Sequence, residues 1–163
     1  MRTAVLALLL VATMPATGQE FGLAPEQIGE IFCLSRLGGD MAPALALASP
    51  VLATAIAHAQ ARNDAIQRAA PDEKPPLGDG IPWQSYPDYA AQCTVGDIHA
   101  SATMSSIEIH YGFPEAPEAN FTDTLVLVPT PVVEGLGPFL RIDDIAYGSG
   151  GTLQDTLVAV FTP

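Results

Sequence analysis

Two adjacent carboxylates, Asp143 and Asp144, are the first candidates for a catalytic role in this sequence. They interrupt a run of branched and aromatic residues at positions 139–147, which predicts a β-strand. Neighbouring strand residues point to opposite faces, so alternation places Asp144, and not Asp143, on the apolar face with Ile142. A carboxylate in an apolar pocket has its pKa raised by loss of hydration, which makes Asp144 a candidate general base. The alternative is a surface carboxylate, or one bound by Arg141 or by backbone amides at a bulge.

A second candidate is the proline-rich segment at residues 71–89. Its five prolines and lack of periodicity exclude a regular helix or a central strand. A connection this long inside a domain is often functional or specifically ordered. Trp83, Tyr86 and Tyr89 could form a stacking surface for a ligand or peptide, or could instead pack the segment against the core. We predict Trp83, Tyr86 and Asp79 as binding residues.

Two sets of side chains could bind a metal ion. His99, His110 and Glu108 lie in neighbouring predicted strands and are residue types that bind zinc. Alternation places Glu108 and His110 on the polar face of their strand, which favours ordinary exposed residues. The proline-rich segment adds four carboxylates of the kind that calcium takes, Asp72, Glu73, Asp79 and Asp88. They lack the D-x-D-x-D-G spacing and no dinucleotide fingerprint occurs, so we expect no metal site and no cofactor.

The two cysteines, Cys33 and Cys93, predict a disulfide. An even number of cysteines is typical of exported chains with disulfides, and no C-x-x-C redox pair occurs. Their separation is too long for a close-spaced metal motif. The alternative is two buried free thiols. A disulfide here would tie a predicted helix to the first predicted strand across the proline-rich segment.

Residues 1–18 have the features of a signal peptide. Arg2 gives a positive start, an apolar run follows, and Ala16-Thr17-Gly18 supplies small residues for cleavage. The apolar run is shorter than the ~20 residues that span a bilayer, which argues against a membrane anchor. We expect export to the periplasm or beyond, a mature chain that begins at Gln19, and no stable membrane association after cleavage.

The net charge of the chain limits the classes of partner that it can bind. There are 6 Lys and Arg against 18 Asp and Glu, a net charge of −12. Such a field repels phosphate backbones, so we expect no nucleic-acid binding, and anionic membrane surfaces are disfavoured as well. The partner we expect is an unidentified small ligand or a protein.

Helices precede strands along the chain. Prolines and capping residues predict helices at residues 25–37, 41–48 and 50–69. Strands are predicted at 93–99, 104–113, 121–128 and 139–147, before a terminal helix at 153–161. Ile142 and Ile145 cannot share one face of a regular strand, so either both faces are covered or a bulge intervenes. We expect both faces to be at least partly covered, in one α+β domain at residues 19–163 with helices packed on a curved antiparallel sheet.

The C-terminal part of the sequence resembles a known superfamily. Leu140-Arg141-Ile142-Asp143-Asp144-Ile145 is followed by glycine-rich residues and then by Thr152-Leu153-Gln154-Asp155-Thr156-Leu157. With the order of elements, these residues resemble the nuclear-transport-factor-two-like superfamily, the cone-shaped α+β fold shared with ketosteroid isomerases, which includes exported bacterial members of unknown function. Leu140 stands where such proteins often have Trp. The resemblance implies a curved sheet folded over helices, with a pocket that is catalytic, binding or filled.

The sequence favours a non-enzymatic binding or accessory protein. One alternative is a small cofactor-independent isomerase or hydro-lyase that uses Asp144 in an apolar cone. Another is an inhibitor-like protein that binds its partner through the acidic surface. An empty apolar pocket around one carboxylate would favour the enzyme, whereas a filled cone would favour binding at the proline-rich segment or at the outer surface.

Overall fold

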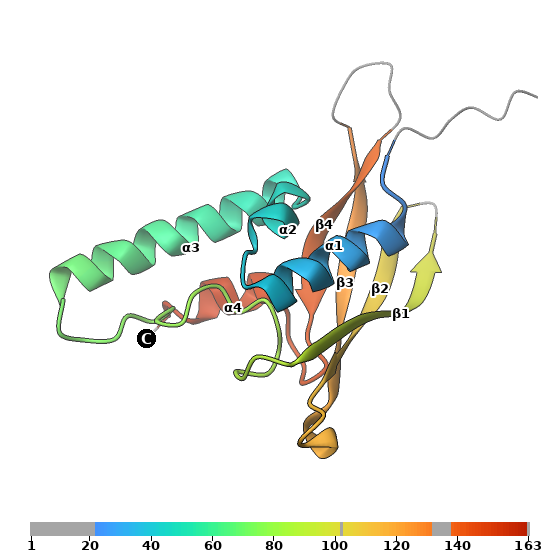
Figure 1. Cartoon of the computed structure of the whole chain (residues 1–163). Coiled ribbons are helices and arrows are strands. Elements are labelled where there is room, and N and C mark those ends of the chain that lie inside the picture. The colour runs from blue at the N-terminus through green and yellow to red at the C-terminus, as the bar shows by residue number, and fades with distance from the viewer. Residues whose placement is uncertain (1–21, 102, 132–137, 163) are drawn as a thin grey trace, which may run out of the picture.

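A four-stranded antiparallel sheet forms one layer of the molecule, and α1 lies across one of its faces (Figure 1). The computed structural model describes residues 22–101, 103–131 and 138–162. The strands follow one another in chain order: β1 Gln92–Ala100, β2 Ser105–Gly112, β3 Phe121–Thr130 and β4 Phe139–Ala146. The chain therefore has the predicted α+β fold, with N-terminal helices on an antiparallel sheet and a short C-terminal helix. The predicted signal peptide lies outside the described residues.

The helices are α1 Pro25–Gly38, α2 Ala42–Ala46, α3 Pro50–Ala69 and α4 Leu153–Ala159, with a 3-10 turn, η1, at Pro117–Ala119. α1 and α3 begin and end within one residue of the predicted bounds, whereas α2 and α4 are shorter than predicted. Ser49 and Thr152 cap α3 and α4, because each hydroxyl accepts a hydrogen bond from a backbone N–H three residues on. Gly39 ends α1 with a positive φ of 70°, a conformation that glycine adopts without steric cost.

The core lies between the helices and the inner face of the sheet. The sheet contributes fully buried aliphatic side chains, Ile107, Ile109, Leu125, Leu127, Ile142 and Ile145. α1 contributes Ile28 and Phe32, and α3 contributes Leu52 and Ile56. α1 approaches the sheet closely at Gly29, where an added Cβ would lie 2.9 Å from the side chain of Val95.

β4 contains a bulge at the acidic pair. Ile142 pairs with Leu127 and Asp144 pairs with Val126, so Asp143 has no residue opposite it in β3. The extra residue lets Ile142 and Ile145 share the buried face. Asp144 instead lies opposite half-buried Val126, so its predicted place on the face of Ile142 is wrong. The bulge, one of the two predicted alternatives, removes the parity conflict.

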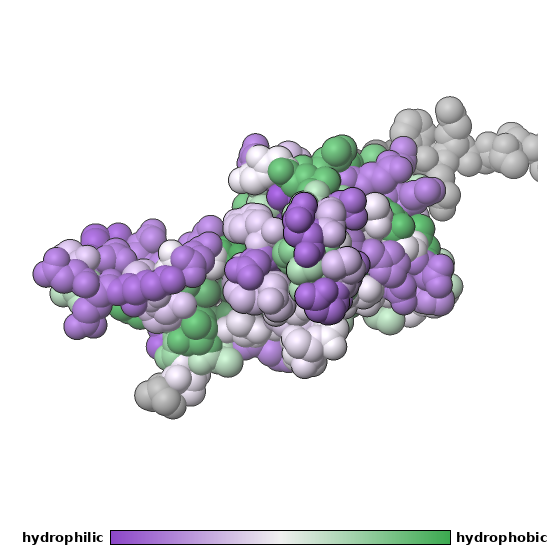
Figure 2. Space-filling model, turned by 60° about the horizontal axis from the view of Figure 1, so that its bottom comes forward, coloured by the Kyte–Doolittle hydropathy of each residue, from purple (hydrophilic) through white to green (hydrophobic). Residues whose placement is uncertain are grey.

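α3 is only partly packed against the rest of the molecule. Its buried residues, Leu52, Ile56 and Ala59, all lie in its first half. Val51, in the first turn of the helix, is exposed. The second half of α3 extends away from the sheet (Figure 1), and this end of the molecule is covered mainly by hydrophilic residues (Figure 2). Arg62 connects this half to the C-terminal segment, because its Nη2 donates a hydrogen bond to the carbonyl of Phe161 at 2.9 Å.

Candidate functional site

The proline-rich segment forms one wall of an open groove with a volume of about 530 Å³. All three predicted binding residues, Trp83, Tyr86 and Asp79, line this groove. Arg36 from the end of α1 also lines it, as do Thr156 and Val160 from the C-terminal segment. Side chains that are distant in sequence therefore converge on one site.

Trp83 forms the buried part of the groove. It is 7% exposed, and its ring meets Phe32 of α1 edge to face, with 6.5 Å between centroids. Such aromatic pairs favour tilted geometries over face-to-face stacks. Trp83 thus packs the segment against the core, which is one of the two roles that the sequence left open, and it also lines the groove.

Two tyrosines form the outer part of the groove. Tyr86 packs against Phe113 and Phe121 with centroid separations of 5.7 and 5.8 Å. Tyr89 is 68% exposed, and the guanidinium carbon of Arg36 lies 4.8 Å from the centroid of its ring. A cation at this distance from an aromatic face is attracted by the ring quadrupole. The groove therefore offers an aromatic surface beside a positive charge.

Asp79 lies at the rim of the groove and is bound to a neighbouring cation. Its Oδ2 is 2.7 Å from Nζ of Lys74, and both side chains are largely exposed. Exposed ion pairs of this kind contribute little to stability. Asp79 sits in a turn before Gly80, whose φ is 94°. Asp79 is thus part of a local turn as well as a lining residue of the groove.

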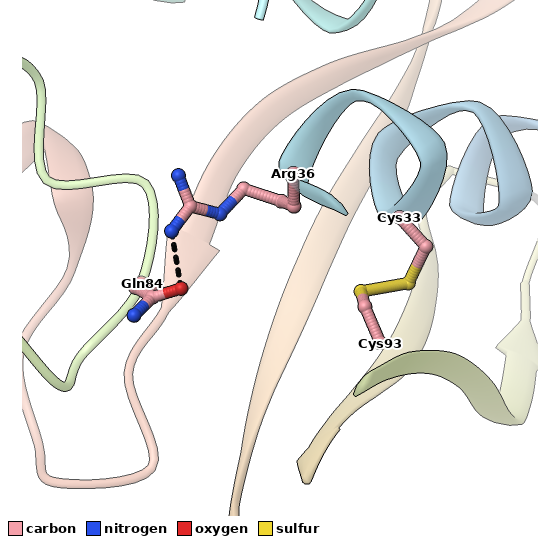
Figure 3. Close-up of a disulfide and its surroundings, with 4 residues drawn as sticks. All are labelled: Cys33, Arg36, Gln84 and Cys93. Carbon is pink, nitrogen blue, oxygen red and sulfur yellow. Dashed lines mark hydrogen bonds between the residues drawn. A yellow bond between two sulfur atoms is a disulfide. The ribbon is translucent and has the colours of Figure 1, made fainter. Parts of the chain in front are cut away.

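Arg36 and Gln84 join the end of α1 to the segment (Figure 3). A guanidinium Nη2 of Arg36 donates a hydrogen bond to Oε1 of Gln84, and both side chains are buried. Gln84 in turn donates from Nε2 to the carbonyls of Tyr86 and Asp88, at 2.7 and 2.6 Å. Gln84 therefore closes a turn of the segment, and Arg36 anchors that turn to the end of α1.

The predicted disulfide is confirmed and lies beside this contact. Cys33, one helical turn before Arg36, is bonded to Cys93 at the start of β1, with 5.2 Å between the Cα atoms (Figure 3). The disulfide ties α1 to the sheet across the whole proline-rich segment. It thereby fixes the helix that presents Arg36 to the groove.

Asp123 is an important residue that the sequence analysis missed. It is 1% exposed on the inner face of β3, and its two oxygens accept hydrogen bonds from backbone N–H groups. Oδ2 accepts from Ser85 at 2.8 Å and Oδ1 accepts from Gly148 at 2.9 Å. Asp123 thus binds the proline-rich segment and the turn after β4 to the sheet. Alternation with Leu125 and Leu127 was a signal that could have placed it on the buried face.

Two tyrosines lie in the same polar region. Burial raises the pKa of Tyr111 well above its usual value, the carboxylate of Asp123 raises it further, and Arg36 acts in the opposite direction. The Tyr111 hydroxyl is buried and has no hydrogen-bond partner among the described residues. Burial also raises the pKa of Tyr147, whose hydroxyl donates to the carbonyl of Pro82. Both phenols therefore remain protonated at physiological pH.

The acidic pair of β4 is engaged in local structure. Oδ1 of Asp144 accepts hydrogen bonds from the backbone N–H groups of Ile145 and Gln154, at 2.8 and 3.0 Å. Oδ1 of Asp143 accepts from the hydroxyl of Ser49 at 2.6 Å. Asp144 is not among the residues that line the groove. The geometry is that of a carboxylate satisfied by backbone amides at a bulge, which the sequence analysis held as an alternative.

The histidines and carboxylates considered for metal binding do not converge. Nε2 of His110 lies 3.6 Å from Oε2 of Glu108 on the outer face of β2, whereas His99 pairs with Ser106 farther along the sheet. Within residues 22–101, 103–131 and 138–162, no group of three or more His, Cys, Asp or Glu side chains could hold a metal ion. In the same ranges, no helix is long and apolar enough to cross a membrane.

Fold and site together define a small α+β protein with an arginine-containing aromatic groove under a proline-rich segment. No protein-family model, curated protein or solved structure matches this chain. The resemblance to the nuclear-transport-factor-two-like superfamily stays a prediction.

Proposed function

We propose that the protein is an exported, non-enzymatic binding or accessory protein that holds a small ligand or a short peptide segment in the groove beside Trp83. The observation that carries the proposal is the groove itself, which combines an aromatic lining with a buried arginine. Its volume of about 530 Å³ lies within the range of small-molecule sites.

The anchoring of the proline-rich segment supports this proposal. The backbone N–H of Leu77 donates to Oδ1 of Asn63 in α3 at 2.7 Å, and that of Ser85 donates to Asp123 in β3. Arg36 of α1 and Tyr147 after β4 hold the segment from two further directions. A binding wall held in place before the ligand arrives costs less ordering entropy upon binding.

Export is a further part of the proposal. The Cys33–Cys93 disulfide is compatible with a periplasmic or extracellular location, because such compartments are oxidising. The apolar residues near the start of the sequence support the same location. The isomerase or hydro-lyase alternative needs Asp144 in an apolar pocket, and the two backbone donors to Asp144 support a structural role instead.

Trp83 provides a direct test, because it is the only tryptophan in the chain. Its indole N–H gives a single signal in a ¹H–¹⁵N correlation spectrum, against which a library of neutral and charged fragments can be screened. Hits in the groove should shift this signal, and Tyr89→Ala should weaken their binding by removing an exposed wall.

Val51→Ala is the matched control, because Val51 is exposed on α3 and does not line the groove. Binding by the control variant should equal that of the wild type. Fragments that bind without shifting the Trp83 signal, or that bind Tyr89→Ala as tightly as the wild type, would place the ligand site elsewhere and refute the proposal.

A further inference from the structure

We propose that the groove selects ligands in which a single carboxylate is attached to an apolar body, and that Arg36 binds the carboxylate. This inference rests on the proposed function, because it names the class of ligand for the same groove. Arg36 contributes the positive charge, and the ring surfaces of Trp83, Tyr86 and Tyr89 contribute the apolar contact.

Arg36 is a buried cation without an acidic partner. The residue is 8% exposed, and its side chain makes one hydrogen bond within the described residues, to the neutral side chain of Gln84. Its Nε has no partner there, and no carboxylate of the described residues forms a salt bridge with it. A buried charge is costly unless it is paired, and a guanidinium has five N–H donors to satisfy.

The chain has enough acidic residues to supply a partner for Arg36. The chain has 18 Asp and Glu against 6 Lys and Arg. Two carboxylates around the groove are engaged elsewhere: both oxygens of Asp123 accept backbone hydrogen bonds, and Asp79 pairs with Lys74 at the rim. Neither of these carboxylates is therefore available to pair with Arg36. Arg36 lines an open groove, which an anion from solution can enter.

The chemistry of the site favours a carboxylate over other anions. The planar guanidinium presents paired donors that match the two oxygens of a carboxylate. A phosphate dianion would bring a second negative charge into a strongly acidic protein, with Arg36 as the one buried cation beside it among the described residues. Tyr89, whose ring already lies against the guanidinium, would flank the bound group on one side.

The test compares two probes of equal shape, 4-phenylbutyrate and its neutral amide, 4-phenylbutyramide, with inorganic phosphate as a third probe. Binding is followed through the Trp83 indole signal of the full-length mature protein. The acid should bind about tenfold more tightly than the amide or better, because a hydrogen-bonded charge is lost in the amide. Arg36→Gln should abolish this preference, and Arg36→Lys should keep part of it, because a lysine retains the charge without the planar fork.

Lys74→Gln is the matched control, because Lys74 is an exposed cation at the rim of the same groove. The acid preference should survive in this variant. Thermal unfolding of each variant checks that it folds. If Arg36→Gln is unfolded, the comparison of acid and amide on the wild type and on Lys74→Gln decides the matter.

Equal binding of acid and amide would overturn the carboxylate preference and leave the groove as a binding site. Preference for phosphate, or loss of the acid preference in Lys74→Gln, would overturn the assignment to Arg36. Failure of both organic probes would overturn the inference as well, whereas the proposed function would fail only if the fragment screen also gave no response at Trp83.

Discussion

Asp123→Ala removes a small side chain but should lower the free energy of unfolding substantially. The carboxylate is fully buried and binds two segments that lie outside the strands, at Ser85 and Gly148. Hydrogen bonds to a charged group contribute about 1.5–3 kcal/mol each, so the two together contribute about 3–6 kcal/mol. Removing a buried charge offsets part of that loss. We therefore expect Asp123→Ala to lower the free energy of unfolding by about 3 kcal/mol, a large fraction of a typical 5–15 kcal/mol.

Asp123→Asn should show an intermediate loss. The amide keeps the shape of the side chain but has one oxygen acceptor, so one of the two backbone N–H groups must face an NH₂ donor. Gly148→Ala offers an independent check on the same contact, because an added Cβ would lie 2.2 Å from the carbonyl oxygen of Thr122 and push the turn away from Asp123.

Urea unfolding gives the free energies, with Trp83 fluorescence reporting on the segment and circular dichroism reporting on the whole fold. Asp64→Ala is the control, because Asp64 is an exposed residue of α3 and alanine favours helices. A loss below about 1 kcal/mol in Asp123→Ala would refute the reasoning, since the backbone donors would then be satisfied by other means. Equal losses in the alanine and asparagine variants would show that charge, and not the number of acceptors, determines the effect.

Three further predictions concern the disulfide, Trp83 and α4. The intact mass of the non-reduced exported protein should be two hydrogens below the dithiol value, and reduction should cost ~4 kcal/mol, as expected for a loop of 60 residues; two thiols that are alkylated after denaturation would contradict this. Trp83→Ala should cost about 3–5 kcal/mol and speed proteolytic cleavage within residues 71–89, whereas unchanged cleavage would show that other anchors suffice. Deletion of residues 151–163 removes buried Leu153, Leu157 and Phe161, each contributing about 1.5–3 kcal/mol, so the truncated chain should be unfolded or insoluble; a cooperative melting transition near that of the full protein would contradict this.

Local patterns were enough to predict the elements and the disulfide. Capping residues, prolines and glycines act within one helical turn, and alternation in β2 places Ile107 and Ile109 inward and His110 outward. In β4, alternation alone could not decide which residues face the core, because the strand contains a bulge. A single extra residue reverses the facing of everything after it, and which residue is extra depends on the pairing with β3.

The sequence predicted the aromatic residues of the candidate site and Asp79 at its rim, but not the buried polar residues that anchor the segment. Trp83 and Tyr86 are conspicuous in a proline-rich segment, whatever they contact. The importance of Arg36 depends on Gln84, 48 residues away, and that of Asp123 depends on Ser85, 38 residues away. No period or motif connects such pairs, because they are brought together only by the packing of α1 and β3 against the segment. Asp123 alone left a local signal, as a polar residue in register with buried Leu125 and Leu127.

Under the proposed function, the two polar anchors link the stability of the fold to the affinity of the groove. Asp123 holds the segment from the sheet and Arg36 holds it from the helix, and Gln84 and Ser85 are adjacent in the chain between them. A ligand that binds only the folded arrangement of this segment must stabilise the protein according to its concentration and affinity. Conversely, a variant that loosens Ser85 lowers the population of the competent groove, and apparent affinity falls by the same fraction. Asp123 is not itself a lining residue of the groove, so Asp123→Asn should weaken binding of the acid and of the amide equally. Arg36→Gln removes an anchor and the cation together, so it should weaken binding of the acid more than binding of the amide. The ratio of the two affinities thus separates a residue that shapes the groove from one that recognises the ligand.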